Sequence, residues 1–264
     1  MTTVSYAVAD SATMLRRNLK RMRRYPAMTL MIIVVPVIFL LLFVYVFGGT
    51  LGAGLGHLSD VRQAYLRYVT PGIILLTLGT QATSTAVSVA MDMSGGIIAR
   101  FRTMAIARVS VLTGHVLGSV IQSLLGIALI IGIAVAMGFR TGADPLAWLA
   151  AVGVLVLITF AITWLSVALG LVSGSVETAS NLPMFLMILP FLGSGFVPTA
   201  TMPVGLRWFA EYQPFTPVIQ TVRGLLTGGP IGDNAIMAIA WGIGIAALSY
   251  LWARRLYRRP MQAK

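Results

Sequence analysis

The sequence predicts an all-α integral membrane protein with six transmembrane helices, and two observations support this class. Of the 264 residues, 58% are hydrophobic and only 10% are charged, whereas soluble domains carry roughly 25% charged residues. The apolar residues also gather in runs, several of which reach the roughly 20 residues that a helix needs to cross a bilayer. A soluble enzyme of this length would need more charged side chains to cover its surface.

Residues 1–26 carry a basic, amphipathic pattern and are predicted to form a cytosolic helix. Apolar residues recur there at helical spacing, and basic residues occupy the other faces. The apolar positions are Val8, Ala12, Leu15, Leu19 and Met22, and the basic ones are Arg16, Arg17, Lys20, Arg21, Arg23 and Arg24. We expect this helix to lie on an anionic inner leaflet. The alternative is a solvated positive flank that only orients the first span.

Six apolar segments within residues 27–253 are predicted to span the membrane as one bundle, followed by a basic cytosolic tail at 254–264. The segments are 27–47, 69–91, 116–139, 146–172, 182–197 and 234–253. The apolar run of the first is longer than a signal-peptide core, so we expect it to be retained. The loops assigned to the inner side hold most of the arginine residues, which places both termini in the cytosol. Residues 60–68 are interpreted either as a short interfacial helix or, as we favour, as a simple anchor at the interface.

The inner loop 92–115 is predicted to contain a short amphipathic helix. Gly95 and Gly96 end the second span, and Ile97, Phe101 and Met104 then share one helical face. This apolar ridge, edged by arginine residues such as Arg100, is typical of a surface that contacts a partner. A helix lying on the lipid surface without a partner is the alternative.

Two further titratable residues lie near the predicted inner side. Glu177 is the only acidic residue between spans four and five. It either caps the start of span five, helped by the helix dipole, or makes a second contact with a cytosolic partner. His115 lies at the inner mouth of the third span, and a histidine without a carboxylate neighbour is more typical of a helix end than of a catalytic base. The six predicted spans contain no Asp, Glu or His.

The stretch 182–226 is apolar and aromatic but is interrupted by glycine and proline residues. Its parts 203–212 and 215–226 are too short to cross a bilayer, so we expect re-entrant or short helices at the outer face. Irregular backbone at membrane depth must be surrounded by protein or water. We therefore predict a packed bundle around this hairpin and an extracellular gate at its aromatic and proline residues. The predicted gate residues are Phe196, Pro198, Pro203, Trp208, Phe209 and Pro214.

An ordered set of residues in this stretch resembles the signature near the last two spans of type-2 ABC transporter permeases, the branch of drug and lipid exporters. The set is Ser194-Gly195-Phe196-Val197-Pro198, then Met202-Pro203, then Pro214, then Arg223. Within that branch the chain is most similar to the daunorubicin-resistance permeases. In these permeases the inner loop is a coupling helix that fits a groove on the ATPase subunit and often begins acidic-x-x-x-Gly, as Asp92 and Gly96 do.

The resemblance therefore implies a set of residues that couple this chain to an ATPase. The set is Asp92, Gly96, Ile97, Arg100, Phe101, Met104 and Glu177. The loop lacks the second acidic residue usual in the family. Two roles consequently stay open for Asp92, a polar contact with the ATPase or a helix cap.

The resemblance implies the permease subunit of an ATP-driven exporter that moves a lipophilic or amphipathic compound, such as an antibiotic or a lipid, out across the cytoplasmic membrane. One six-helix bundle has no second half to line a pathway, so we expect a dimer with two copies of a separate ATPase subunit. That subunit would bind ATP and magnesium, because the sequence lacks a Gly-x-x-x-x-Gly-Lys-Ser/Thr loop. We expect no cofactor, metal or catalytic residue in this chain.

Three alternatives to an exporter fit the sequence less well. The net charge of +12 would suggest nucleic acid in a soluble protein, but here we attribute it to the inner loops. A proton-coupled secondary multidrug transporter would need a titratable side chain inside a span, and the predicted spans have none. A non-transport membrane enzyme would need titratable residues facing one another at depth. We therefore expect transport to be driven by ATP hydrolysis in a partner subunit.

Overall fold

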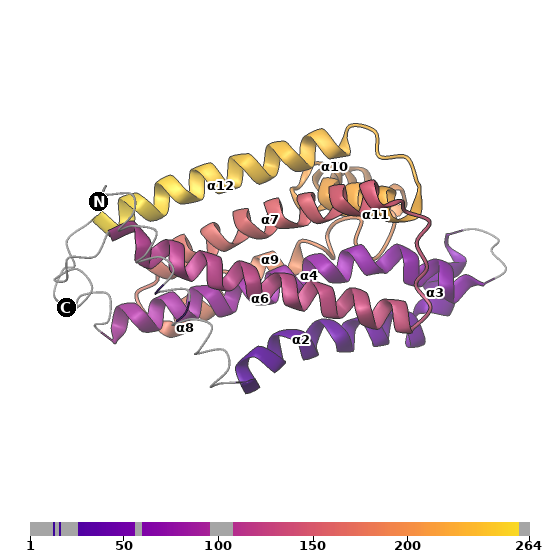
Figure 1. Cartoon of the computed structure of the whole chain (residues 1–264). Helices are drawn as coiled ribbons and strands as arrows, with labels where there is room; N and C mark the ends of the chain where they lie inside the picture. Colours follow the sequence, from indigo (N-terminus) through magenta and orange to yellow (C-terminus); the bar gives the residue numbers. More distant parts are fainter. Residues whose placement is uncertain (1–12, 14–15, 17–25, 56–59, 96–107, 259–264) are drawn as a thin grey trace.

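The structure, a computed structural model, describes residues 13, 16, 26–55, 60–95 and 108–258. Over these residues it is a bundle of helices without a strand, which confirms the predicted all-α class. The long helices lie side by side along one axis (Figure 1). The predicted amphipathic helix within 1–26 and most of the basic tail fall outside the described residues.

Among the described residues, four helices are long and apolar enough to cross a membrane. They are α4 (Val61–Ser94), α6 (Arg108–Ala136), α7 (Pro145–Val172) and α12 (Asn234–Arg258). The first predicted span consists of α2 (Pro26–Leu41) and the π-helix η1 (Leu42–Val46), whose described apolar part, Ile33–Val46, is shorter than a full span. The count of six spans therefore stays a prediction.

The remaining elements are short. They are α3 (Gly48–Ala53), α8 (Val176–Asn181), α9 (Met184–Ile188), η2 (Thr199–Thr201), α10 (Val204–Tyr212) and α11 (Phe215–Thr227). The predicted fifth span, 182–197, is not one helix: only the five residues of α9 are helical, and turns follow as far as Val197. The physical reason is that proline residues, such as Pro190, lack the N–H that a helix requires, and glycine residues disfavour one.

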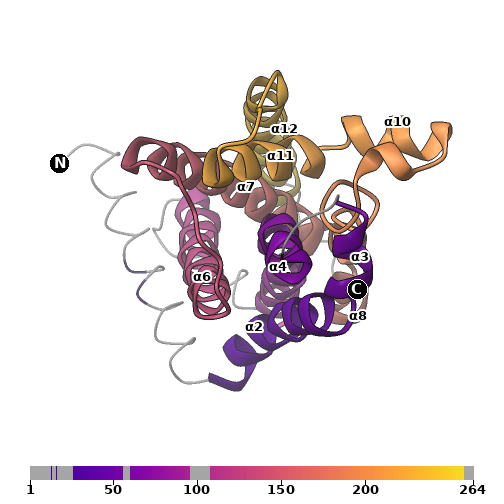
Figure 2. The same ribbon diagram turned by 90° about the vertical axis from the view of Figure 1, so that its right-hand side faces the viewer.

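Helix α4 is the centre of the bundle. Its most apolar window is 72% buried, against 17% for α12, and α4 packs against α2, α6, α7, α9 and α11. The view along the bundle shows α4 with helices around it (Figure 2). Its 34 residues extend over about 51 Å at 1.5 Å per residue, which is more than the roughly 30 Å of a bilayer core.

The interpretation of residues 60–68 as a separate interfacial helix is wrong, because these residues begin α4. The carboxylate of Asp60 accepts the backbone N–H of Gln63 at 3.0 Å, which caps the helix at this point. Tyr65 and Leu66 are each only 1% exposed. Their burial makes the first turns of α4 part of the core and not a surface anchor.

Two glycine residues of α4 allow α9 and the broken segment after it to approach closely. A Cβ atom at Gly72 would overlap the carbonyl oxygen of Gly195, and one at Gly79 would come within 2.8 Å of the Cα atom of Met187. Small residues permit such backbone contact between packed elements in membranes. The irregular segment therefore lies directly against the central helix.

The elements separate into two ends of the bundle (Figure 1). The end of α4, the beginning of α6, α8 and the end of α12 lie at one end, which we call the inner end. The helices α3, α10 and α11 lie at the other, which we call the outer end. The sequence predicted that these two groups of elements lie at opposite faces of the membrane. The orientation itself stays a prediction.

Candidate functional site

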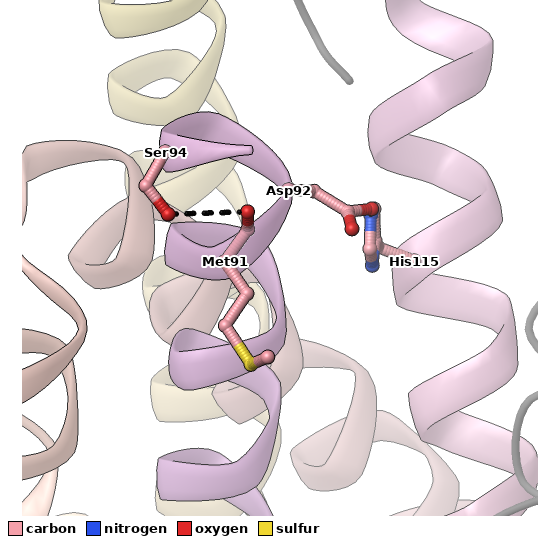
Figure 3. A network of polar contacts seen from close by, with 4 residues as sticks. All are labelled: Met91, Asp92, Ser94 and His115. Carbon is pink, nitrogen blue, oxygen red and sulfur yellow. Dashed lines mark hydrogen bonds and ion pairs between the residues drawn. The ribbon is translucent and has the colours of Figure 1, made fainter. Parts of the chain in front are cut away.

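A buried contact between a carboxylate and a histidine joins α4 and α6 at the inner end. Asp92 lies in the last turn of α4, and its Oδ2 atom is 3.0 Å from Nε2 of His115 on α6. The two side chains face each other across the gap between the helices (Figure 3). They are 5% and 4% exposed respectively. Because burying an unpaired carboxylate is costly, the pairing offsets a penalty that either group alone would carry.

This pair overturns two predictions. Asp92 lies in the last turn of α4, a helix long and apolar enough to cross a membrane, so the predicted boundary that left it outside the second helix is wrong. His115 has a carboxylate neighbour, so the prediction that it lacks one is also wrong. The physical reason is that the two residues are 23 positions apart and meet only because α4 and α6 pack side by side.

Asp92 does not cap the end of α4, and its predicted alternative role as a cap of the helix in the following loop lies outside the described residues and stays a prediction. The helix ends at Gly95, whose backbone N–H donates to the carbonyl oxygen of Met91 at 2.9 Å. The hydroxyl of Ser94 donates to the same oxygen at 3.2 Å (Figure 3). The end of α4 is therefore capped by its own backbone and by Ser94, which leaves the Asp92 carboxylate directed at α6.

The other predicted coupling residues are only partly placed. Gly96, Ile97, Arg100, Phe101 and Met104 lie outside the described residues, so their coupling role stays a prediction. Glu177 is exposed in the first turn of α8. It does not cap that helix.

The cap of α8 is Ser175. The Ser175 hydroxyl accepts the N–H of Thr178 at 3.1 Å, and serine is a preferred N-cap residue. The carboxylate of Glu177 still lies where the helix dipole favours a negative charge.

At the outer end, side chains satisfy the backbone of the irregular segment that follows α9. Gln213 donates to the carbonyl oxygen of Leu189 at 3.2 Å, and the hydroxyl of Tyr65 donates to that of Phe196 at 3.1 Å. The N–H of Ser194 donates to the Thr216 hydroxyl at 3.2 Å. Lipid cannot supply such partners, so these contacts allow a broken chain to persist against α4.

Arg223 of α11 contacts both this segment and α4. Its guanidinium donates to the carbonyl oxygen of Ser194 at 2.6 Å and to that of Tyr68 at 3.0 and 3.2 Å. It also lies over the Tyr68 ring, 3.8 Å from the centroid, within the range of a cation–π contact. Burial lowers the pKa of Arg223, and the interaction with Tyr68 opposes this shift. Arg223 thus ties α11, α4 and the broken segment together.

The predicted gate residues do not form one cluster. Phe196 is 3% exposed and stacks on Phe191 with ring centroids 4.2 Å apart. Trp208 and Phe209 lie on α10 and are 68% and 41% exposed. The three proline residues precede short helices, as their lack of an N–H favours: Pro198 before η2, Pro203 before α10 and Pro214 before α11. The gating role stays a prediction.

Sequence reasoning missed the roles of Tyr65, Gln213 and Thr216. Polar side chains within apolar, proline-broken stretches are a signal for such backbone contacts, because irregular backbone in lipid needs donors and acceptors. The sequence singles out Arg223 only as the last residue of the permease-like signature. Its partner Tyr68 is 155 residues away, so no local pattern could identify that contact.

Comparison with known proteins identifies the family. The profile described as ABC-2 type transporter matches residues 11–227. The chain belongs to this family. The permease is similar to the daunorubicin resistance ABC transporter permease protein DrrB1 of Streptomyces coeruleorubidus, with 27% identity over 253 residues, 96% of this chain and 87% of the relative.

A second relative supports the same assignment. The permease is 26% identical to the "Probable doxorubicin resistance ABC transporter permease protein DrrC" of Mycobacterium tuberculosis over 254 residues, 96% of this chain and 89% of the relative. The resemblance that the sequence suggested is confirmed. The chain is thus a multi-pass membrane permease of the ABC-2 type.

Proposed function

We propose that this permease is the transmembrane subunit of an ATP-driven exporter and that two copies assemble with two copies of a separate ATPase subunit. One observation carries the proposal: the similarity to permeases named for daunorubicin and doxorubicin resistance extends over 96% of the chain. A single bundle with α4 at its centre has no second half to line a pathway, which favours the dimer. The cargo is a lipophilic or amphipathic compound, such as an antibiotic or a lipid.

The proposal includes an orientation in the cytoplasmic membrane. Both termini and the segment 96–107 between α4 and α6 face the cytosol, where this segment contacts the ATPase. The elements α2 and η1 form the first of six spans, and α9 with the turns after it forms the fifth. The broken hairpin with α10 and α11 closes the outer side. The segments assigned outside hold only five of the 19 Lys and Arg residues, which supports this orientation.

A proton-coupled transporter is the second candidate, and the Asp92–His115 pair is the observation that favours it. Proton carriers use buried titratable residues within membrane helices, and this pair is buried in α4 and α6. We prefer ATP hydrolysis as the energy source because the chain matches the ABC-2 type transporter family.

Transport in proteoliposomes that contain the permease and its ATPase tests the proposal, with daunorubicin as the probe. We expect uptake that requires ATP and persists after the proton gradient is collapsed. Uptake by the permease alone, driven by a pH gradient, would contradict the proposal and support the proton-coupled alternative. Phe101→Asp should abolish co-purification with the ATPase. The matched control is Val204→Asp on α10, where the side chain is already 87% exposed.

A further inference from the structure

Helices α4 and α6 are joined by a row of polar side-chain contacts that begins at Asp92 and His115. The hydroxyls of Thr85 and Ser119 are 3.0 Å apart, and the Gln81 amide donates to that of Gln122 at 3.1 Å. We call this row the α4–α6 polar seam. Its members are Gln81, Thr85, Asp92, His115, Ser119 and Gln122.

The seam follows one face of each helix. On α4 its members are spaced by four and seven residues, and on α6 by four and three, which are the spacings of side chains that lie above one another on a helix. From residue 92 to residue 81 it extends over about 16 Å at 1.5 Å per residue. The length of the seam is therefore about half the thickness of a bilayer core, which is roughly 30 Å.

The burial of the seam gives it mechanical strength. On α4, Gln81, Thr85 and Asp92 are 3%, 2% and 4% exposed as whole residues. If the helices separated, the contacts of Gln81 with Gln122 and of Asp92 with His115 would be lost in buried surroundings, whereas the Thr85 hydroxyl would keep its bond to the carbonyl oxygen of Gln81. The seam therefore resists separation of α4 from α6.

The two helices connected by the seam also flank the predicted coupling segment and reach the outer end. Asp92 precedes residues 96–107 by one turn of helix, and His115 follows them within α6. At its other end α4 contacts the broken segment, through Gly72 against Gly195 and through Tyr68, whose carbonyl oxygen accepts from Arg223. One continuous helix thus connects the inner loop with the outer hairpin.

We propose that Asp92 and His115 are positioning residues that lock α6 to α4, so that both helices move as one body and carry ATPase-driven movement to the outer hairpin. The proposal rests on the proposed ATP-driven function. It assigns the buried pair a role in coupling and not in carrying protons. A two-state movement of this body, biased by the ATPase, is what would connect the two ends.

Substitutions of the pair test this role in the complex with the ATPase. We expect Asp92→Ala and His115→Ala each to lower the daunorubicin transported per ATP hydrolysed by about fivefold or more, a typical size for a coupling between sites. Exchange of the two residues, Asp92→His with His115→Asp, should restore much of the ratio. The control is Thr163→Val, because the Thr163 hydroxyl is equally buried but bonds within α7 to Thr159. An unchanged ratio in both single variants would overturn the proposal.

A disulfide across the seam provides a test that does not depend on disrupting the pair. The chain has no cysteine, and the 3.0 Å between the Thr85 and Ser119 hydroxyls is compatible with the short Cβ separation of a disulfide. With Thr85→Cys and Ser119→Cys, we expect oxidised protein to transport as the reduced protein does. Transport that stops on oxidation and returns on reduction would show that the helices must separate, and would overturn the proposal. Failure of ATP-dependent transport by the unaltered permease would instead contradict the proposed function.

Discussion

At the scale of single residues, the irregular segment after α9 depends on donors supplied from distant parts of the chain. Arg223 illustrates this dependence, because one guanidinium serves the carbonyl oxygens of both Ser194 and Tyr68. Arginine suits the position, since its planar fork presents several N–H groups in fixed directions. A lysine would present a compact ammonium and could not serve both carbonyl groups in the same geometry.

Arg223→Met should therefore destabilise the permease. Methionine is of similar length but removes every donor, and each buried carbonyl group left without a partner costs about 1 to 3 kcal/mol. Arg223→Lys should recover only part of this loss. The measurement is the thermal unfolding midpoint in detergent. The matched control is Arg207→Met, because Arg207 pairs with Glu211 on the exposed surface of α10, where an ion pair contributes about 0 to 1 kcal/mol. Equal midpoints for Arg223→Met and the unaltered protein would contradict the structural role.

Asp92 and His115 show which features of single residues could be predicted from the sequence. The end of α4 near Gly95 was predicted, because glycine disfavours helix. The partnership of Asp92 with His115 was not, since it depends on how two helices pack. A boundary error of a few residues placed Asp92 in a loop and removed it from the list of buried groups.

At the scale of elements, the two short helices of the outer hairpin differ in burial. Helix α11 contributes Phe215, Val218, Ile219 and Val222 to the core, each 0% exposed. Helix α10 is largely exposed and is fixed at its end by Trp241, whose Nε1 donates to the carbonyl oxygen of Tyr212 at 3.2 Å. The proline residues in the sequence predicted where both helices begin. Their different burial could not be predicted, because it depends on which helix packs against α4 and α7.

This difference makes α10 a good place to test the predicted gate. Truncation of Trp208 and Phe209 to Ala should lower daunorubicin-stimulated ATP hydrolysis while assembly with the ATPase stays intact, because both side chains are largely exposed. Phe196→Ala should instead lower the unfolding midpoint, since truncation of a buried phenylalanine costs about 3 to 5 kcal/mol. A double α10 variant with normal stimulation would remove α10 from the gate.

At the scale of the whole molecule, the arrangement of α4, α6, α7 and α12 is what places the predicted inner and outer segments at opposite ends. Alternating long helices return the chain to the same end after every second crossing, and the sequence predicted this alternation from apolar runs alone. The crossing within 182–197 was not predicted correctly in detail. The apolar composition was sufficient to predict that this segment lies in the membrane. It forms α9 and turns and not a straight helix, because it contains Pro183, Pro190, Gly193 and Gly195.

Single cysteine residues would decide the orientation of this arrangement. Because the chain has no cysteine of its own, each introduced thiol reports one position. Thr201 in η2, shortly before α10, and Gly174, shortly before α8, are both exposed. Helices α10 and α8 lie at opposite ends of the bundle (Figure 1). Since arginine residues are retained on the cytosolic side, we expect Thr201→Cys to react with a membrane-impermeant maleimide in intact cells. Gly174→Cys should react only after permeabilisation, and the opposite pattern would invert the orientation and place the outer hairpin in the cytosol.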